Sequence, residues 1–502
     1  MLRSTRMVVL LGLAVQIAAF LRTAIIAAAL GTSPDVDAYN LGLIAPSFLS
    51  TVIGSWLQLS FIGRYTSLVT TGQSDLAAAY RARMLVLVAG ASGLLAGLCF
   101  LFPGPIMGLF MPAGQTSMIA AAAAALRLSG LILIPILLSD FLSLILNSHG
   151  RFFAAAFAPF VNALVSIIGL WAWPSLNLQV LVWTLLLGSL AQCLAVVFAL
   201  SRMHLNFPLR TAAARGDVWT TLALAVPLLP AAMLANATTA VVQFSAAGLG
   251  EGAVAIYGYA SRLHGALAQV LVIGLSTVLL PHFAALWSRG EKVEILILFR
   301  RLARVTVLLT AYLGTGIYLM GGTATKILLE RGAFDAQHSA QAAWLWALLS
   351  LSLFPFAFGT YIAKFCQSLR GAGSVLVSSV ISFIVTWCMA RFGTSSASLD
   401  IITGAAAVSA TAVTCFWLVW LWRQIPAMPV LADIAMAALR IGLILIPAAL
   451  VERWVRPSVQ DWPSLLDLLV RGLCYSAVVL LLLMASRSHR WFLDRSPGSG
   501  GT

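Results

Sequence analysis

The sequence predicts an all-α membrane protein with about fourteen transmembrane helices, arranged as two six-helix halves around a central cavity plus two C-terminal helices. Of the 502 residues, 61% are hydrophobic and only 9% are charged, and the mean hydropathy is +0.98. Soluble domains carry about 25% charged residues. The apolar residues form runs of roughly 20, which is the length that crosses a bilayer. These runs are too long and continuous for barrel strands, so we expect helices.

Breaks at glycine, proline and clusters of charge divide the chain into the expected spans. The first span follows Arg3 and Arg6 and contains Arg22, a residue that the apolar core of a signal peptide tolerates poorly. We therefore expect this segment to be retained as a span. The fourteen expected spans are 7–30, 38–62, 84–102, 118–147, 153–173, 180–201, 218–247, 254–284, 302–320, 340–366, 374–391, 402–422, 434–451 and 465–485.

The loop charges predict the orientation of these spans. When the spans alternate from the N-terminus, most of the 30 Lys and Arg residues fall in loops on one side. The opposite side holds Lys326, Arg331, Arg391, Arg453 and Arg456. The positive-inside rule then places both termini in the cytoplasm. It also explains most of the net charge of +14, so we expect membrane lipids and no nucleic acid as partners.

A short repeat suggests that the chain is duplicated. Ala29-Leu30-Gly31 leads to Asp37-Ala38-Tyr39 between the first two spans, and Gly248-Leu249-Gly250 leads to Ala255-Ile256-Tyr257 between the seventh and eighth. Repeated halves around a central site are common in transporters, although chance similarity between helices rich in Ala, Leu and Gly explains two short matches as well. The expected organisation is a half at 1–217, a second half at 218–425, and two additional spans with a short cytoplasmic tail at 426–502.

Charged residues inside the expected spans are the best candidates for a site. They are the cations Arg22, Arg127, Arg262, Lys364, Arg440 and Arg471 and the acids Asp140 and Asp467. A charge at mid-bilayer costs ~2.5–3.5 kcal/mol on insertion scales, so it needs a polar cavity, a partner or a headgroup within reach. Because the cations outnumber the acids, an anionic substrate is the economical explanation, and guanidinium groups suit phosphate. Snorkelling or helix capping explains several of the cations equally well.

Five of the polar residues in the expected spans are candidates for specific roles. Arg22 and Arg262 lie away from the cytoplasmic ends of their spans and are the strongest substrate-binding candidates. His264, two residues after Arg262, helps to shape the cavity, and Lys364 is a third candidate cation. Asp140 is a candidate for ion coupling, and a counter-ion or a plain helix-end acid are the other interpretations.

Motifs of other protein classes are missing from the sequence. It contains no Walker A, HExxH or GxSxG sequence, and its loops are too short for a catalytic domain, so we expect no enzyme, no metal site and no cofactor. The six cysteines all lie in apolar runs, which argues against disulfides and CxxC sites.

Several stretches carry a family resemblance. They are Phe20–Ile26 (FLRTAII), Leu30-Gly31, Asp37-Ala38-Tyr39 and Pro46; Leu146–Phe152 (LNSHGRF), Ala156–Pro159 (AFAP) and Asn162; and Tyr259–Leu263 (YASRL) with Thr277–Pro281 (TVLLP). In order and spacing they resemble the MurJ/MviN lipid II flippases of the multidrug/oligosaccharidyl-lipid/polysaccharide exporter superfamily.

The resemblance implies a transporter of the bacterial inner membrane that serves peptidoglycan and cell-wall synthesis. Such a flippase moves an undecaprenyl-pyrophosphate-linked glycan from the cytoplasmic to the outer leaflet by alternating access. The family's cavity arginines match Arg22 and Arg262, and its loop aspartate matches Asp37, which joins the substrate-binding candidates. The resemblance implies that the lipid-linked glycan is the binding partner. It also makes the enzymes of glycan synthesis candidate protein partners.

The sequence also departs from the family pattern. Gln16 stands where the family has an arginine, Thr23 where it has an acid, and Ser50 and Ser55 where it has an arginine and an acid. A cavity with fewer charges would suit an exopolysaccharide or another lipid-linked oligosaccharide equally well. A cation-coupled drug exporter of the same superfamily would favour buried acids over arginines, and a non-transporting scaffold for glycan synthesis is a further alternative.

Overall fold

The computed structural model describes residues 2–111, 115–208, 215–225, 229–369, 372–425, 430–459, 461–486, 488 and 491, and within them it is helical without a strand. The chain divides into two compact units. The first comprises Met1–Ala255 with Arg331–Phe334, and the second comprises Ile256–Glu330 with Asp335–Thr502. The expected division at 217 and 425 stays a prediction.

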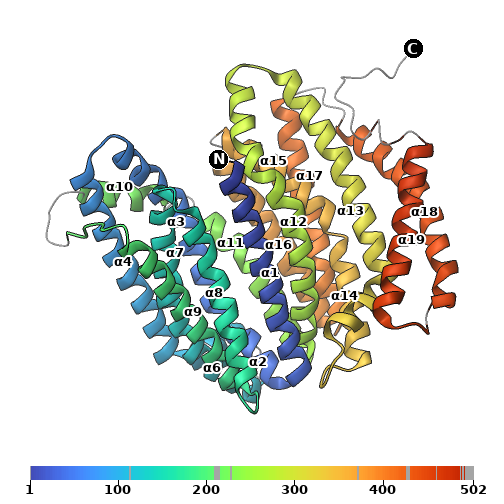
Figure 1. Ribbon diagram of the computed structural model, residues 1–502, viewed down its shortest axis with the longest axis horizontal. Helices are drawn as coiled ribbons and strands as arrows, with labels where there is room; N and C mark the ends of the chain where they lie inside the picture. Colours follow the sequence, from blue (N-terminus) through green and yellow to red (C-terminus); the bar gives the residue numbers. More distant parts are fainter. Residues whose placement is uncertain are drawn as a thin grey trace. The chain divides into compact units, whose positions relative to one another are not determined.

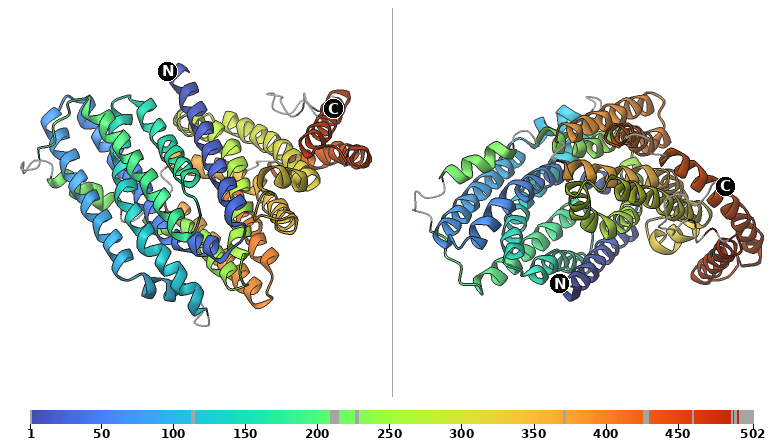
Figure 2. Two further views of the ribbon diagram at one scale, coloured as in Figure 1. Left: turned by 60° about the horizontal axis from the view of Figure 1, so that its bottom comes forward. Right: turned by 90° about the horizontal axis from the view of Figure 1, so that it is seen from above.

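The first unit is a helix bundle in which α3, α4, α7, α8 and α9 run side by side (Figures 1 and 2). Its helices are α1 (Leu2–Leu30), α2 (Pro34–Gly42), α3 (Ile44–Thr70), α4 (Ser74–Leu101), α5 (Pro103–Phe110), α6 (Thr116–Ser129), the 3₁₀ turn η1 (Gly130–Ile132), α7 (Leu133–Ser148), α8 (Phe152–Ala172), α9 (Leu178–Ser201), α10 (Arg215–Ala225) and α11 (Leu229–Ala247). α8 packs against both α1 and α9.

Close approach and buried amides hold α7, α8 and α9 together. A Cβ on Gly188 of α9 would lie 2.4 Å from Ser166 Oγ on α8, so only glycine fits at this contact. One turn away, Asn162 Nδ2 donates to Gln192 Oε1 (2.9 Å) and Gln192 Nε2 donates to Ser139 Oγ (3.1 Å). Within a bilayer the hydrophobic effect does not drive helices together, so small residues and interhelical hydrogen bonds stabilise their packing.

The second unit continues α12 (Ala253–Ser288) and adds α13 (Lys292–Leu329), α14 (Ala336–Ser350), α15 (Leu353–Ser368), α16 (Ala372–Ser395), α17 (Leu399–Gln424), α18 (Val430–Val459) and α19 (Ser464–Ala485). Its core is aromatic: the rings of Phe283 and Phe299 stack at 5.0 Å, and Phe365 meets both of them. α18 and α19 form a hairpin that packs on α13 (Figure 1).

The membrane-spanning character is confirmed, whereas the count of fourteen stays a prediction. Ten helices or continuous helix runs of the described chain are long and apolar enough to cross a membrane. The pair α14 and α15, bent by 41°, makes eleven if it is one span. The remaining expected spans at 218–247, 254–284 and 302–320 fall on α10 and α11, on α12 and on α13.

Candidate functional site

Arg22 is held against the ring of Tyr39 within the first unit. Its guanidinium donates a hydrogen bond to the Tyr39 hydroxyl, and its Cζ lies 5.7 Å from the centre of that ring. Tyr39 itself is 1% exposed, so its orientation is fixed by packing. In the described ranges no carboxylate pairs with Arg22, and its buried Nε has no acceptor. The result is a half-buried, uncompensated positive charge on a transmembrane helix.

Asp37 caps the N-terminus of α12. Its Oδ2 accepts from the backbone N–H of Gly252 at 2.6 Å, and its Oδ1 accepts from that of Ala255 at 2.7 Å. The side chain is fully buried. An anion is favourable there because the first N–H groups of a helix have no partner within the helix. This geometry gives Asp37 a structural role, and its predicted contact with substrate stays a prediction.

Two glycines make close backbone contacts near Asp37, in the same unit. Gly31 follows α1 and Gly332 follows α13, and both have positive φ, +57° and +59°. A Cβ on Gly31 would lie 2.4 Å from the carbonyl oxygen of Ala333, and one on Gly332 would lie 2.1 Å from that of Ala28. Ala333 N–H also donates to the Ala28 carbonyl at 2.8 Å. The α1–α2 turn, the residues before α12 and residues 331–334 therefore make one seam, which we call the Asp37 seam.

The other substrate-binding candidates lie in the second unit. Arg262 is half-buried on α12. His264 Nε2 lies 3.2 Å from Ser352 Oγ, whose own hydrogen goes to the Leu349 carbonyl at 2.7 Å. His264 is therefore the donor in this pair, and no described residue donates to its buried Nδ1, which is left as an acceptor. Lys364 Nζ donates to Gln367 Oε1 of its own helix at 3.3 Å.

Asp140 is a half-buried acid of α7. Within the described residues it forms no hydrogen bond and no ion pair. It sits on α7 and faces α3, where a Cβ on Gly54 would lie 3.9 Å from Asp140 Oδ2. No group of three or more His, Cys, Asp or Glu that could hold a metal ion occurs in the described ranges. Asp140 is thus an acid in a span for which the described residues show no partner.

A polar cluster ties α3 to α4 and α10 in the first unit. Arg64 pairs with Asp217 at 2.6 Å, and Arg81 Nη1 lies 3.4 Å from the hydroxyl of Tyr65. Tyr65 in turn shares a hydrogen bond of 3.0 Å with Nε2 of His149, in the turn between α7 and α8. Burial lowers the pKa of His149, and the charge of Arg81 lowers it further. Arg64 and Arg81 are among the basic residues expected on the cytoplasmic side.

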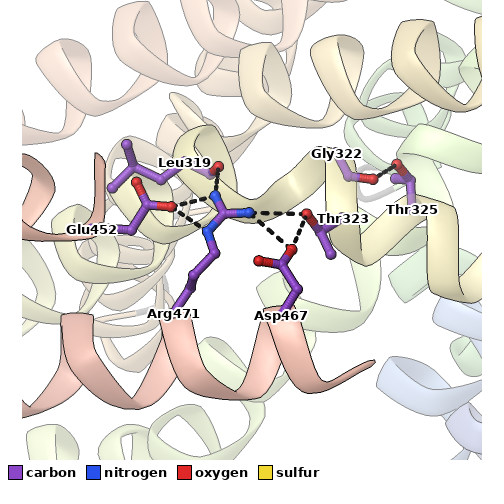
Figure 3. Close-up of polar contacts among 7 residues, drawn as sticks. All are labelled: Leu319, Gly322, Thr323, Thr325, Glu452, Asp467 and Arg471. Carbon is purple, nitrogen blue, oxygen red and sulfur yellow. Dashed lines mark hydrogen bonds and ion pairs between the residues drawn. The ribbon is translucent and has the colours of Figure 1, made fainter. Parts of the chain in front are cut away.

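The remaining cations in the spans have neighbours in the protein. Arg127 is exposed, and its Cζ lies 5.9 Å from the centre of the Phe100 ring. Arg440 lies in the same way over Trp491, at 4.4 Å. Arg471 is 2% exposed and belongs to a buried ionic cluster (Figure 3). Among these four cations, the contacts between described residues pair only Arg471 with carboxylates, whereas Arg22, Arg127 and Arg440 lie against uncharged groups.

Sequence reasoning overlooked two residues that set these environments. Tyr39 was part of the recognised Asp37-Ala38-Tyr39 pattern, but its spacing from Arg22 gave no sign of the contact. Glu452, the main partner of Arg471, lies just past the expected end of its span at residue 451. A search for a counter-ion to Arg471 would have found it.

Comparison with known proteins assigns the family. The family model of the lipid II flippase MurJ matches residues 26–473. A probable lipid II flippase MurJ of Rhizobium meliloti is 24% identical over 438 residues, which cover 84% of this chain and 81% of that protein. The lipid II flippase MurJ of Burkholderia cenocepacia is 30% identical over 201 residues, 38% of this chain and 39% of that one.

Solved structures show the same fold. A lipid II flippase MurJ in an inward closed conformation superposes with a TM-score of 0.79 at 17% identity, covering 96% of this chain and 99% of that one. An inward-facing multidrug resistance transporter of the MATE family gives 0.69 at 15% identity, with coverages of 82% and 95%. With a family model that spans most of its length, the chain is a multi-pass membrane protein of the lipid II flippase MurJ family.

Proposed function

We propose that this chain moves lipid II, a polyprenyl-pyrophosphate-linked glycan, from the cytoplasmic to the outer leaflet of the bacterial inner membrane. The observation that carries the proposal is Arg22, an uncompensated guanidinium fixed by Tyr39 in a transmembrane helix. A charge in that position needs a polar cavity, a partner or a headgroup within reach, and an anionic substrate would supply the partner. The match to the lipid II flippase family supports the pyrophosphate of lipid II as that anion.

The binding step follows from the chemistry of the guanidinium group. Arg22 offers planar N–H donors that match two phosphate oxygens at once. Tyr39 holds the guanidinium in place, which reduces the entropy lost when the anion binds. Arg262 and Lys364 are the candidate substrate-binding cations of the second unit. His264 Nδ1, an acceptor that lacks a donor, is suited to a sugar hydroxyl.

Alternating access requires one end of the transport path to open while the other closes. We assign the Asp37 seam to the outer end, because the loop charges place the α1–α2 turn outside and both termini in the cytoplasm. Two charge-assisted hydrogen bonds and two reciprocal glycine contacts keep this end shut. In each transport cycle the contacts of the Asp37 seam would break and form again. The substrate crosses the membrane without any change to its covalent bonds.

Asp140 is the proposed coupling group of this cycle. A carboxylate without a protein partner in a span binds a cation or a proton more readily than one already in an ion pair. We expect flipping by Asp140→Asn to lose its response to an imposed membrane potential, with Asp400→Asn, an exposed acid of α17, as the matched control. An unchanged response in Asp140→Asn would remove this assignment.

The test of the proposed function is flipping in proteoliposomes. Purified protein is reconstituted with lipid II, with a polyprenyl-linked exopolysaccharide repeat unit, or with a cationic drug, and the transferred substrate is measured. We expect lipid II to be transferred and the drug not to be transported. Transfer of the exopolysaccharide unit but not of lipid II would overturn the assignment of the substrate. Absence of transfer of any lipid-linked glycan would overturn the function.

A further inference from the structure

The chain that follows α19 contacts two other helices of the second unit through Trp491. The backbone carbonyl of this residue accepts a hydrogen bond from Arg304 Nη1 of α13 at 2.7 Å. The centre of its ring lies 4.9 Å from Cζ of Arg304 and 4.4 Å from Cζ of Arg440 on α18. A single residue after the last helix is therefore bound to both α13 and α18.

The ring of Trp491 also packs against an apolar cluster. Buried residues of α13, α18 and α19 form this cluster, among them Val307, Ile441 and Leu483. Trp491 is half-buried as a result. An aromatic ring that meets both an apolar surface and a cation is stabilised by burial and by the attraction between the charge and its π face.

Positive charge is in excess around this ring. Arg300 pairs with Asp433 at 2.5 Å, and Arg304 Nε lies 3.9 Å from the same carboxylate. Arg304 and Asp433 are each only 5% exposed, so water does little to screen them. One carboxylate thus serves two guanidinium groups, and Arg440 brings a third cation to the ring. The carbonyl oxygen and the π face of Trp491 supply further negative partners at this place.

The other end of the same three helices is held by Arg471. This residue of α19 is bound to Glu452 of α18 and to the Leu319 carbonyl of α13, as Figure 3 shows. Trp491 contacts the first halves of α13 and α18, whereas Arg471 contacts their second halves. The two groups of contacts are therefore separated along the helices.

We propose that Trp491, Arg304 and Arg440 form a strap, the Trp491 strap, which fixes the α18–α19 hairpin to α13 at the end opposite Arg471. Trp491 follows α19 in the chain, Arg440 belongs to α18 and Arg304 to α13, so the contact joins all three helices. Its loss lets the hairpin separate from α13 more often at this end. None of the three residues is a substrate-binding candidate, so the proposal does not depend on the substrate.

Thiol labelling of the full-length protein in phosphatidylcholine nanodiscs tests the strap. The background replaces the six native cysteines by serine, and single cysteines then report on chosen positions. Ser488→Cys, at a site that is 6% exposed, reports release of the chain after α19. Ala437→Cys and Ala448→Cys, both at fully buried sites of α18, report separation of the hairpin near Arg440 and near Glu452.

Trp491→Ala should speed labelling at positions 488 and 437 and leave position 448 unchanged. The increase should be roughly tenfold or more, because two cation–π contacts, each worth about two- to thirtyfold, are lost together with the burial of the ring. Trp491→Tyr keeps an aromatic ring and should restore most of the protection. Trp454→Ala, which removes an exposed tryptophan of α18, is the matched control and should label as the parent does.

Arg440→Gln tests the cation of the strap while the tryptophan is kept. It should speed labelling at position 488 roughly two- to thirtyfold, whereas Arg453→Gln, an exposed arginine of α18, should have no effect. Combined with Trp491→Ala, Arg440→Gln should add nothing, since the contact is already absent.

Three results would overturn the proposal. The first is labelling of position 488 at the parent rate in Trp491→Ala or in Arg440→Gln. The second is faster labelling at position 488 with position 437 unchanged, because the tail would then be docked without holding the hairpin. The third is an equal increase at positions 437 and 448, which would indicate a general loosening of the unit.

Discussion

The Asp37 seam allows a prediction whose size can be worked out from the structure. In Asp37→Asn one of the two carboxylate oxygens becomes an NH₂ group, which cannot accept from a backbone N–H. Hydrogen bonds to charged groups contribute about 1.5–3 kcal/mol each, so losing one should weaken the closed seam roughly ten- to hundredfold. We expect the population with an open outer end to rise by that factor.

The assay is thiol labelling of Ala38→Cys, a position that is fully buried in the closed seam. The background replaces the six native cysteines by serine, and an impermeant maleimide is added from outside. Asp37→Asn should label faster by roughly the factor above, while Glu251→Gln, which removes an exposed like charge close to Asp37, should label no faster than the parent. Equal labelling of Asp37→Asn and parent would refute the assignment of Asp37 as the cap that holds this end shut.

Three further predictions concern stability in detergent. Gly332→Ala places a Cβ 2.1 Å from the Ala28 carbonyl and should lower the melting temperature clearly more than Gly290→Ala, which has a positive φ but open space; equal losses would leave the close contact without importance. The lowered pKa of His149 means that the unfolded chain binds more protons, so stability should fall as pH drops through about 6.5, and His149→Gln should lack this acid-side loss. Gln192→Ala, which breaks two buried hydrogen bonds, should destabilise the protein by about 1–3 kcal/mol in reversible unfolding, and a neutral result would contradict the role given to this network.

The positions of many helices could be predicted from hydropathy. The expected span 153–173 corresponds to α8, 180–201 to α9 and 465–485 to α19. These spans are predominantly apolar, although the third contains Asp467 and Arg471, and they end at clear breaks, so composition is enough to place them. Composition reports length and apolarity, and it carries no information about bends.

Broken spans show that limit. The expected span 118–147 is α6, a 3₁₀ turn and α7, and the turn begins at Gly130, whose absent Cβ would lie 2.4 Å from Cys99 Cβ on α4. The expected span 340–366 is bent by 41° between α14 and α15. At the first break the close contact of Gly130 with α4 accounts for the geometry, and in both spans the apolar pattern runs through unchanged.

The sequence allowed us to predict which residues belong to the candidate site, but it gave less information about what each residue does. Arg22 was identified because a charge in a span is costly, and the structure adds the contact with Tyr39 that orients it. The cap made by Asp37 was out of reach, since its partners Gly252 and Ala255 lie more than two hundred residues away along the chain. Contacts over such distances depend on the fold.

The affinity of purified protein for lipid II, measured for Arg22→Gln beside wild type, tests the central claim most directly. The matched control is Arg127→Gln, which removes an exposed arginine of the same unit. If Arg22 binds the pyrophosphate, its loss removes a charge-assisted contact of about 1.5–3 kcal/mol and should raise the Kd roughly ten- to hundredfold. Arg127→Gln should leave the Kd unchanged. A Kd for Arg22→Gln equal to that of wild type would contradict the account.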